Sequence, residues 1–469
     1  MVIYRHKKVS STSSNWSDCI CIKDYMQEIK KVILTEEKMI TVNDLTNGSS
    51  IPSRADIITN NPMKVINLTQ LVHMLSDMLD LVGVNDLHHS KRVAYMCLET
   101  GRTFGFNHSQ MEKLYQAALL HDCGVSSTSV HNHIIKEMDW SGAPEHCARG
   151  STLLEAQPLF RHLSPIILLH HTHWQELDPS FSDWVAMLGN LIHLCDRADA
   201  LMQQSASKPW LSVRNSVRDT LVHYKGSWFS PKLLEAFLAA SRTESFWLSM
   251  QPQHLSQYMT EQELVDPHPM VSTGRLRYVA ELAAEIVDTK SHYTACHSQG
   301  VARFSAHLAE KAGFETDVCW QIEIAGLLHD IGKMRVPDSI LEKPASLSFS
   351  EKAVMLGHSF ESYQILHHVK GFEDISRWGA YHHETLIGDG YPFHLTEADL
   401  EIPARIIAIA DIFQAMTQER PYRPAKDPDA VFDSLEHRVS QHRIDPDLVK
   451  LVEDDFEACW EAAALQQKT

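Results

Sequence analysis

The stretch AGLLHDIGKMRVP, from Ala325 to Pro337, decides the fold of this sequence. An apolar run typical of a buried helix ends in His329 and Asp330, and Lys333 follows three residues later. A histidine next to a carboxylate is costly in an apolar core unless both groups are paired or bind a metal. Upstream, AALLHDCGVSS repeats the pattern between residues 117 and 127, so the chain contains two related units.

Two long spacings between histidines recur in these units. One spacing is 32 residues and the other is 24, and each unit ends with a His-His pair and then an aspartate in an apolar helix. The first unit has His89, His121, Asp122, His146, His170, His171 and Asp196 at these positions. The second unit has His297, His329, Asp330, His358, His382, His383 and Asp411. Two matched spacings together indicate a duplicated module.

The apolar pattern is helical in both copies. In VARFSAHLAEKAGF the apolar Val301, Phe304 and Leu308 fall on one helix face, and Gly313 supplies a stop. Strand-like alternation is scarce, so we expect an all-α protein with two tandem helical bundles. The expected parts are a polar accessory or poorly ordered segment at 1–62 and domains at 63–255 and 270–469. Met63 opens a helical pattern and is a second candidate for the start of translation.

Composition excludes several classes of function. The 469 residues are 44% apolar and 22% charged, as in ordinary globular proteins. No apolar run approaches the ~20 residues of a membrane span, and the N-terminus lacks the apolar core of a signal peptide. The nine cysteines form no disulfide framework, so we expect a cytoplasmic protein without a membrane partner. A net charge of −18 argues against binding a nucleic-acid polymer.

Histidine is over-represented, with 29 residues against 19 glycines. Five imidazoles and two carboxylates in the second copy suit iron, manganese or zinc, and the absence of a thiolate argues against a structural zinc site. Seven ligands exceed the need of one ion, so we expect two divalent ions with Asp330 bridging them. Two ions about 3.5–4 Å apart stabilise both the attacking and the leaving oxygen of a phosphoester. Lys333 would add a cation beside the phosphoryl oxygens.

Four motifs resemble one known family. HDIGK, HHE at His382 to Glu384, GDGYP at Gly388 to Pro392 and RPYR at Arg420 to Arg423 resemble the HD-GYP domain. This domain is a bacterial branch of the HD-domain metal-dependent phosphohydrolases, and the resemblance covers about residues 287–426. It implies two tandem HD-type bundles, iron or manganese, and hydrolysis of a cyclic dinucleotide to a linear dinucleotide and on to mononucleotides. The implied substrate is cyclic di-GMP or 3′3′-cyclic GMP-AMP.

The resemblance also implies roles for single residues. Asp330 and Lys333 would be catalytic, and Lys333, Arg420, Arg423 and Tyr391 would contact the substrate. The GYP loop would govern substrate access and pair with diguanylate or dinucleotide cyclase domains. The implied metal ligands are His297, His329, Asp330, His358, His382, His383 and Asp411.

The second copy departs from the family pattern at two places. Members with three metals carry a glutamate where this chain has Tyr293, so we expect a two-metal site. Thr385, Leu386 and Ile387 replace the usual Arg-Trp-Asp before the glycine, which leaves the base preference open.

The first copy keeps the ligand types but loses other motif residues. Val125 occupies the lysine position, no GYP sequence follows the His-His pair, and KPWL replaces RPYR. We therefore expect a degenerate HD domain that regulates or packs, rather than a second active site.

Two alternatives for the whole chain stay open. One is an HD hydrolase of another nucleotide, such as a dNTP or a hyperphosphorylated guanosine, which the GYP and RPYR elements disfavour. The other is a non-catalytic scaffold that binds a cyclic dinucleotide or a cyclase. Loss of Lys333 or of any ligand would favour the scaffold, and the second copy has lost none of them.

Overall fold

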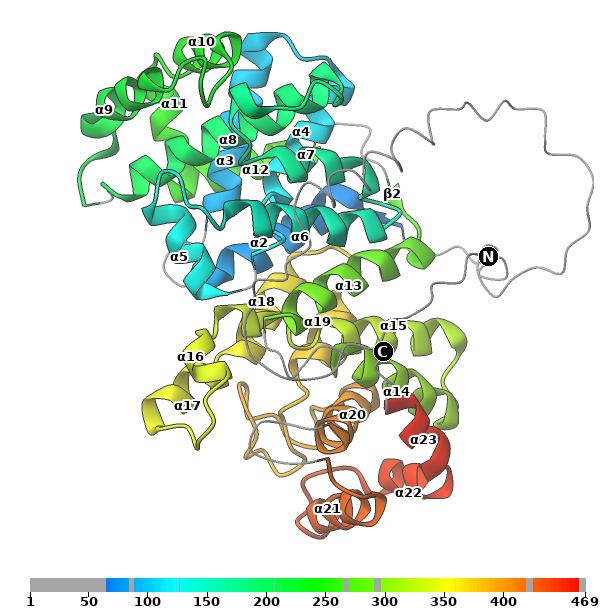
Figure 1. The fold of residues 1–469 in the computed structure, drawn as a ribbon. Helices are drawn as coiled ribbons and strands as arrows, with labels where there is room; N and C mark the ends of the chain where they lie inside the picture. Colours follow the sequence, from blue (N-terminus) through cyan, green and yellow to red (C-terminus); the bar gives the residue numbers. More distant parts are fainter. Residues whose placement is uncertain are drawn as a thin grey trace, which may run out of the picture. The chain divides into compact units, whose positions relative to one another are not determined.

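Two successive series of helices build the described part of the chain (Figure 1). The computed structural model describes residues 65–83, 88–125, 127–205, 207–264, 270–290, 297–418 and 425–463. These residues belong to one compact unit. The predicted accessory segment, the candidate start at Met63, Tyr293 and the two arginines Arg420 and Arg423 lie outside the described residues.

The first module extends from α2 to α12. Its longest helix, α8, is buried along almost its whole length and carries Asp196 in the middle of that buried face. Short 3-10 turns lie at Leu81–Gly83, Arg161–Leu163 and Trp174–Glu176. The helices are α2 (Leu68–Asp80), α3 (His89–Phe104), α4 (His108–Leu120), α5 (Thr128–Lys136), α6 (Ala143–Ala156), α7 (Ser164–Leu169), α8 (Asp183–Gln203), α9 (Trp210–His223), α10 (Pro231–Ala240), α11 (Glu244–Leu248) and α12 (Pro252–Leu264).

The second module extends from α13 to α23, with a 3-10 turn at Ile331–Arg335. Its apolar helix α20 carries Asp411 and packs on α14 and α19. The helices are α13 (Thr273–Asp288), α14 (His297–Lys311), α15 (Thr316–Leu328), α16 (Asp338–Leu341), α17 (Phe349–Leu356), α18 (His358–His367), α19 (Glu373–Ala380), α20 (Ile402–Thr417), α21 (Pro428–Ser440), α22 (Pro446–Asp454) and α23 (Phe456–Ala463).

Local signals in the sequence explain where several helices begin and end. Asn107 and Ser348 each form a capping box, at the starts of α4 and α17, with the residue three positions later. Gly313, the predicted stop after α14, has a φ of +83°, a left-handed conformation that glycine adopts without strain.

The predicted all-α class is confirmed, with one small addition. Strand β1 (Ile66–Asn67) pairs in antiparallel fashion with β2 (Met270–Val271), so the beginnings of the two modules are hydrogen-bonded to each other. A pair this short leaves no alternation in the sequence, which is why it was not predicted. None of the described helices combines the length and apolarity needed to cross a bilayer.

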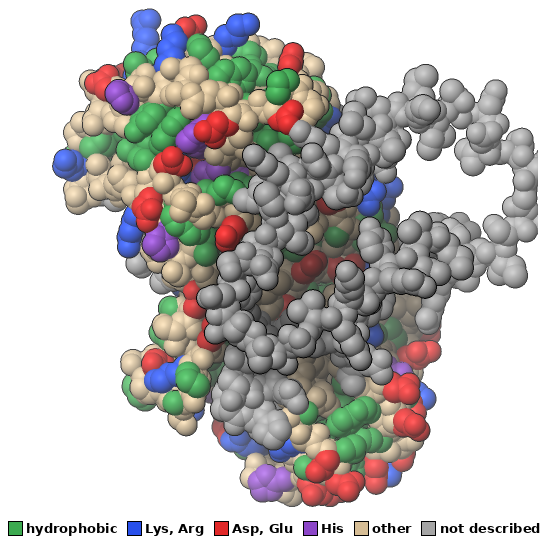
Figure 2. Space-filling view, viewed as in Figure 1, with side chains coloured by type: hydrophobic (Ala, Val, Ile, Leu, Met, Phe, Trp, Pro, Cys, Tyr) green, Lys and Arg blue, Asp and Glu red, His purple; other side chains and the backbone are tan. Residues whose placement is uncertain are grey.

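Acidic side chains gather around the last helices, in agreement with the negative net charge. Glu453, Asp454 and Glu457 are exposed on α22, α23 and their connection, where Figure 2 shows a cluster of acidic groups. Lys450 forms ion pairs with two of them. This surface repels anions, so an anionic ligand needs a locally cationic site elsewhere.

Candidate active site and metal centre

The HD motif of the second module forms the turn at the end of α15, which brings His329 and Asp330 to one place. A Cβ atom on Gly332 would lie 2.0 Å from the carbonyl oxygen of His358, so only glycine lets this turn approach α18. The Gly332 N–H donates to Ser362 Oγ (3.0 Å), and that hydroxyl donates to the His329 carbonyl (2.8 Å). The motif glycine therefore brings two histidines from separate helices together.

An aspartate outside the motif fixes the first histidine. Asp288 accepts hydrogen bonds from the backbone N–H of Ser298 (3.1 Å) and from its hydroxyl (2.8 Å), which anchors the start of α14 at His297. On the other side, His297 Nδ1 contacts Gln414 Oε1. Gln414 lies three residues after Asp411 on α20, so one helix face supplies both a candidate ligand and the group that orients another.

Backbone carbonyls orient three more imidazoles. In each case Nδ1 donates to the carbonyl three residues earlier, at 2.7 Å. The pairs are His329 with Gly326, His358 with Met355, and His382 with Gly379. Because Nδ1 carries the donated hydrogen, Nε2 keeps its lone pair, as in metal-binding histidines with a fixed outer partner.

The carboxylate of Asp330 lies between two pairs of imidazoles. Its Oδ2 lies 3.5 Å from His297 Nε2 and 3.2 Å from His329 Nε2. Its Oδ1 lies 3.4 Å from His358 Nε2 and 3.8 Å from His382 Nε2. Each oxygen thus faces a different pair of histidines, which is the arrangement expected of a bridging carboxylate.

Asp411 and His383 complete the convergence of the predicted ligands. Asp411 Oδ1 lies 3.3 Å from His297 Nε2. All seven candidate ligands therefore meet in one place, although they come from five helices and the turns between them. Two sets of donor atoms each lie within 4.8 Å of one another: His297, His329 and Asp330, and His358, His382 and His383.

The donors of this centre fit divalent metal ions. Among the described residues, His297 Nε2, His329 Nε2 and Asp330 Oδ1 are buried without a hydrogen-bond partner. Unpaired buried polar atoms are costly, and a bound cation would satisfy them. Nitrogen and oxygen donors without sulfur suit iron or manganese. Ligation by these seven residues and the identity of the ions stay predictions.

Burial and neighbouring charges set the protonation of the donors. Burial lowers the pKa of His358 to about 4 and that of His383 to about 3, so both rings are neutral at pH 7 and offer a lone pair. Burial alone would raise the pKa of Asp330, but the nearby His329 and Lys333 hold it well below its usual value. The Asp330 carboxylate is therefore ionised.

Lys333 places a cation beside the Asp330 carboxylate. Its Nζ contacts Asp330 Oδ2 from the same turn. The lysine side chain is about 20% exposed, whereas that of the aspartate is almost fully buried. The ammonium group therefore lies at the boundary between the histidine cluster and solvent.

Glu384 holds the GYP loop. It is buried, and its carboxylate accepts hydrogen bonds from the backbone N–H groups of Phe393 (2.7 Å) and Leu395 (3.0 Å). A Cβ atom on Gly390 would lie 2.5 Å from the Cα atom of Glu384, so this glycine permits the close approach of the loop to the HHE turn. The glutamate of HHE is thus a positioning residue.

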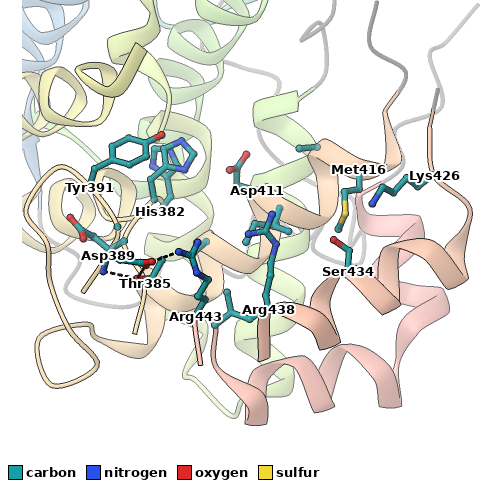
Figure 3. A pocket seen from close by; sticks show the side chains of 17 residues that line it. His382, Thr385, Asp389, Tyr391, Asp411, Met416, Lys426, Ser434, Arg438 and Arg443 are labelled. Carbon is teal, nitrogen blue, oxygen red and sulfur yellow. Dashed lines mark hydrogen bonds and ion pairs between the residues drawn. The ribbon is translucent and has the colours of Figure 1, made fainter. Parts of the chain in front are cut away.

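A cavity of about 410 Å³ opens beside the histidines (Figure 3). The ring of Tyr391 stacks on His383 with ring centroids 4.7 Å apart and forms part of the wall. Figure 3 shows Arg438 extending toward Asp411, and Arg443 extending toward Asp389. Other polar lining residues are His382, Glu384, Thr385, Asp389, Lys426 and Ser434.

Sequence reasoning missed several residues of this site. Helical spacing from Asp411 could have identified Gln414, and the HHE motif included Glu384 without giving it a role. Arg438 and Arg443 had no such signal, because they lie beyond the motifs and reach the cavity only through the packing of α21 and the turn after it.

Comparison with known proteins agrees with this geometry. Residues 86–202 and 280–448 each match the HD domain family. The 3′3′-cGAMP-specific phosphodiesterase 1 of Vibrio cholerae is 34% identical over 400 residues, which are 82% of this chain and 91% of that protein. The chain belongs to the HD-GYP branch of the HD-domain family. Its resemblance to metal-dependent phosphodiesterases with two HD domains in tandem is confirmed.

One further relative and one solved structure are also similar to this HD-GYP protein. A cyclic di-GMP phosphodiesterase of Thermotoga maritima is 34% identical over 162 residues, which are 34% of this chain and 43% of that protein. The crystal structure of a cyclic GMP-AMP-specific phosphodiesterase of V. cholerae superposes with a TM-score of 0.60 and 23% identity. That match covers 84% of this chain and 98% of the other, and it shows a shared fold.

The first module of this HD-GYP protein keeps the donor arrangement. Asp122 Oδ2 lies 3.7 Å from His89 Nε2 and 3.5 Å from His121 Nε2. Asp122 Oδ1 lies 3.5 Å from His146 Nε2 and 3.8 Å from His170 Nε2. As in the second module, each oxygen of the aspartate faces its own pair of imidazoles.

The groups around the histidines of the first module differ from those around the histidines of the second module. Val125 is buried at the position of Lys333, so the lysine that contacts Asp330 has no counterpart at this position beside Asp122. Arg197 donates to Asp196 Oδ2 at 2.8 Å and so occupies one oxygen of the candidate ligand. The Cys147 thiol lies 3.9 Å from the Nε2 atoms of two histidines, at the position of Ser359 in the second module.

Aromatic rings pack where the second module has its GYP loop. His173, two residues after the His-His pair, stacks on Trp228 with ring centroids 4.5 Å apart. The backbone N–H of Trp174 donates to the Trp228 carbonyl at 2.9 Å. The first module thus covers the region after its His-His pair with packed rings.

Proposed function

We propose that this HD-GYP protein hydrolyses a cyclic dinucleotide in its second module, with 3′3′-cyclic GMP-AMP preferred over cyclic di-GMP. The observation that carries the proposal is the position of Asp330, whose oxygens face separate histidine pairs beside Lys333. The relative aligned over 91% of its length is named for 3′3′-cGAMP, whereas the T. maritima cyclic di-GMP enzyme aligns with 34% of this chain. The product is a linear dinucleotide, which further hydrolysis would convert to mononucleotides.

Two divalent ions, iron or manganese, complete the proposed site. His297, His329 and Asp411 would hold one ion, His358, His382 and His383 the other, and Asp330 both. When bound, two such cations lower the pKa of water and stabilise the attacking and leaving oxygens of a phosphodiester. The fit of buried, unpartnered donors to cations supports this assignment.

Side chains of this protein would stabilise the charge that develops in the reaction and would position the substrate. Hydrolysis adds a water oxygen to phosphorus and breaks the bond to the 3′ oxygen, so the product carries a 5′-phosphate and a free 3′-hydroxyl. Lys333 would donate hydrogen bonds to the non-bridging phosphoryl oxygens as negative charge develops on them. Tyr391 offers a ring at the cavity wall against which a base can stack. Arg420 and Arg423, proposed as further substrate contacts, lie outside the described residues.

Two other observations support the proposed partner and location. Next to the GYP motif, the Ile387 side chain is 51% exposed, which leaves an apolar group accessible to a cyclase domain. The described cysteines Cys97, Cys123, Cys147, Cys195, Cys319 and Cys459 are free thiols, which agrees with a reducing compartment such as the cytoplasm.

The experiment that tests the proposal varies the metal and the substrate independently. Purified protein is loaded with Fe(II) or Mn(II) and incubated with 3′3′-cyclic GMP-AMP or cyclic di-GMP, and products are resolved by chromatography. We expect faster linearisation of 3′3′-cyclic GMP-AMP and loss of turnover in Asp330→Asn. Hydrolysis of neither dinucleotide with either metal would overturn the proposal.

A further inference from the structure

The cavity beside the histidines has a second wall that no motif describes. Helix α21 contributes Ser434 and Arg438 to it, and the segment before that helix contributes Lys426. Figure 3 shows the Arg438 side chain rising from α21 toward Asp411, with Lys426 beyond Met416. Cationic side chains therefore line the same cavity as the candidate ligands His382, His383 and Asp411.

Arg443 is a third cation at this cavity, and the three are not equivalent. Arg443 forms an ion pair with Asp389, which in turn accepts a hydrogen bond from Thr385 (2.7 Å). Within the described part of the chain, no carboxylate lies in ion-pair range of Arg438 or Lys426. The Nε atom of Arg438 is also buried without a hydrogen-bond partner.

An unpaired guanidinium group at a cavity wall needs an explanation in a protein with a net charge of −18. Burying part of a cation without a partner is unfavourable, and carboxylates are abundant in this chain. Guanidinium is the side chain best suited to forked hydrogen bonding with a phosphate. The missing partner is therefore expected to arrive with the ligand.

A cyclic dinucleotide carries an anion that would pair with the Arg438 guanidinium. Its ring contains two phosphodiester anions, of which only one is cleaved at a time. In the proposed function the cleaved phosphate would lie with the histidines and Lys333, so the other anion would face the remaining cavity wall. A volume of about 410 Å³ is in the range of small-ligand pockets.

We propose that Arg438, assisted by Lys426, binds the second, uncleaved phosphate of the substrate. This subsite rests on the proposed function of the second module. The Arg438 subsite makes the enzyme selective for ligands with two phosphates over simple phosphodiesters. Arg443 instead supports the GYP loop through Asp389.

The test compares a substrate with two phosphates and a probe with one. In Arg438→Gln, we expect KM for the cyclic dinucleotide to rise about 10- to 100-fold, with kcat within about threefold of the wild type. Hydrolysis of bis(p-nitrophenyl) phosphate, which has no second phosphate, should change less than about threefold. Arg438→Lys should recover part of the affinity, because it restores the charge. Arg275→Gln, at an exposed arginine of α13, is the matched control and should leave both substrates unaffected.

The other outcomes separate the possible failures. An unchanged KM for the cyclic dinucleotide in Arg438→Gln overturns the subsite. An equal loss with both substrates also overturns it, because the arginine then acts in chemistry or folding. Failure of the wild type to cleave either cyclic dinucleotide, while the probe is hydrolysed, overturns the proposed function instead.

Discussion

Asp122 and Asp330 occupy equivalent positions in the two modules, and each directs its two oxygens to different pairs of histidines. The surroundings of the two carboxylates differ. Asp330 contacts Lys333 and lies near an open cavity, whereas the first module has buried Val125 at the lysine position and stacked rings after its His-His pair. Donor geometry alone therefore does not define an active site. The groups that meet the substrate distinguish the modules.

The largest effect expected from this comparison concerns Asp330 and Asp122, the aspartates of the two HD motifs. Asp330→Asn should lower kcat for the cyclic dinucleotide by at least about 1,000-fold, because one buried carboxylate serves both sets of donors. Asp122→Asn should leave kcat within about threefold. Steady-state kinetics of both variants checks this, and a comparable loss in Asp122→Asn would show that the first module also catalyses.

The second effect concerns Lys333, whose position in the first module is occupied by Val125. Lys333→Met should lower kcat by about 100-fold, because a positioned donor to developing negative charge typically contributes two to three orders of magnitude. Lys352→Met, at an exposed lysine of α17, is the control. Metal content measured by mass spectrometry should not change in Lys333→Met. If the metal were lost, the role of the lysine would be structural.

The third effect concerns the HD-motif glycine that both modules share. A Cβ atom on Gly124 would lie 1.9 Å from the His146 carbonyl oxygen, much as one on Gly332 would lie 2.0 Å from that of His358. Gly124→Ala and Gly332→Ala should each destabilise the protein by about 1–3 kcal/mol, visible as a lower thermal unfolding midpoint. The remaining folded Gly124→Ala protein should hydrolyse substrate normally. Unaltered unfolding of both variants would contradict the close approach of turn and helix.

The smallest effect concerns the loop that only the second module has. Glu384→Gln loses the charge behind two backbone hydrogen bonds, so KM for the cyclic dinucleotide should rise about tenfold with little change in kcat. Glu397→Gln, an exposed position on the same loop, should match the wild type. A fall in kcat alone would place Glu384 in the chemistry and not in loop support.

The sequence predicted the parts of this site that have a local signature. The histidine spacings and the HD pair identify donors that the fold brings together, because each lies at a helix end or on an apolar helix face. The HDIGK lysine was predictable for the same reason. The role of Gly332 became clear only from the packing of its turn on α18.

Other features depend on contacts between distant segments, and no single segment encodes them. Arg438 reaches the cavity from a helix that carries no motif, and its lack of a partner is a property of the folded chain. The aromatic cover of the first module joins His173 to Trp228, which is 55 positions away. Periodicity and motif spacing do not report such pairs.

The short pairing of β1 with β2 has a consequence for how the two modules are joined. Ile66 lies opposite Val271, so the chain enters and leaves the first module at nearly the same point. Adjacent ends are the property that makes domain insertion tolerable, because the rest of the chain can close without the inserted part. The roughly 200 residues between these strands thus have the connectivity of an inserted domain.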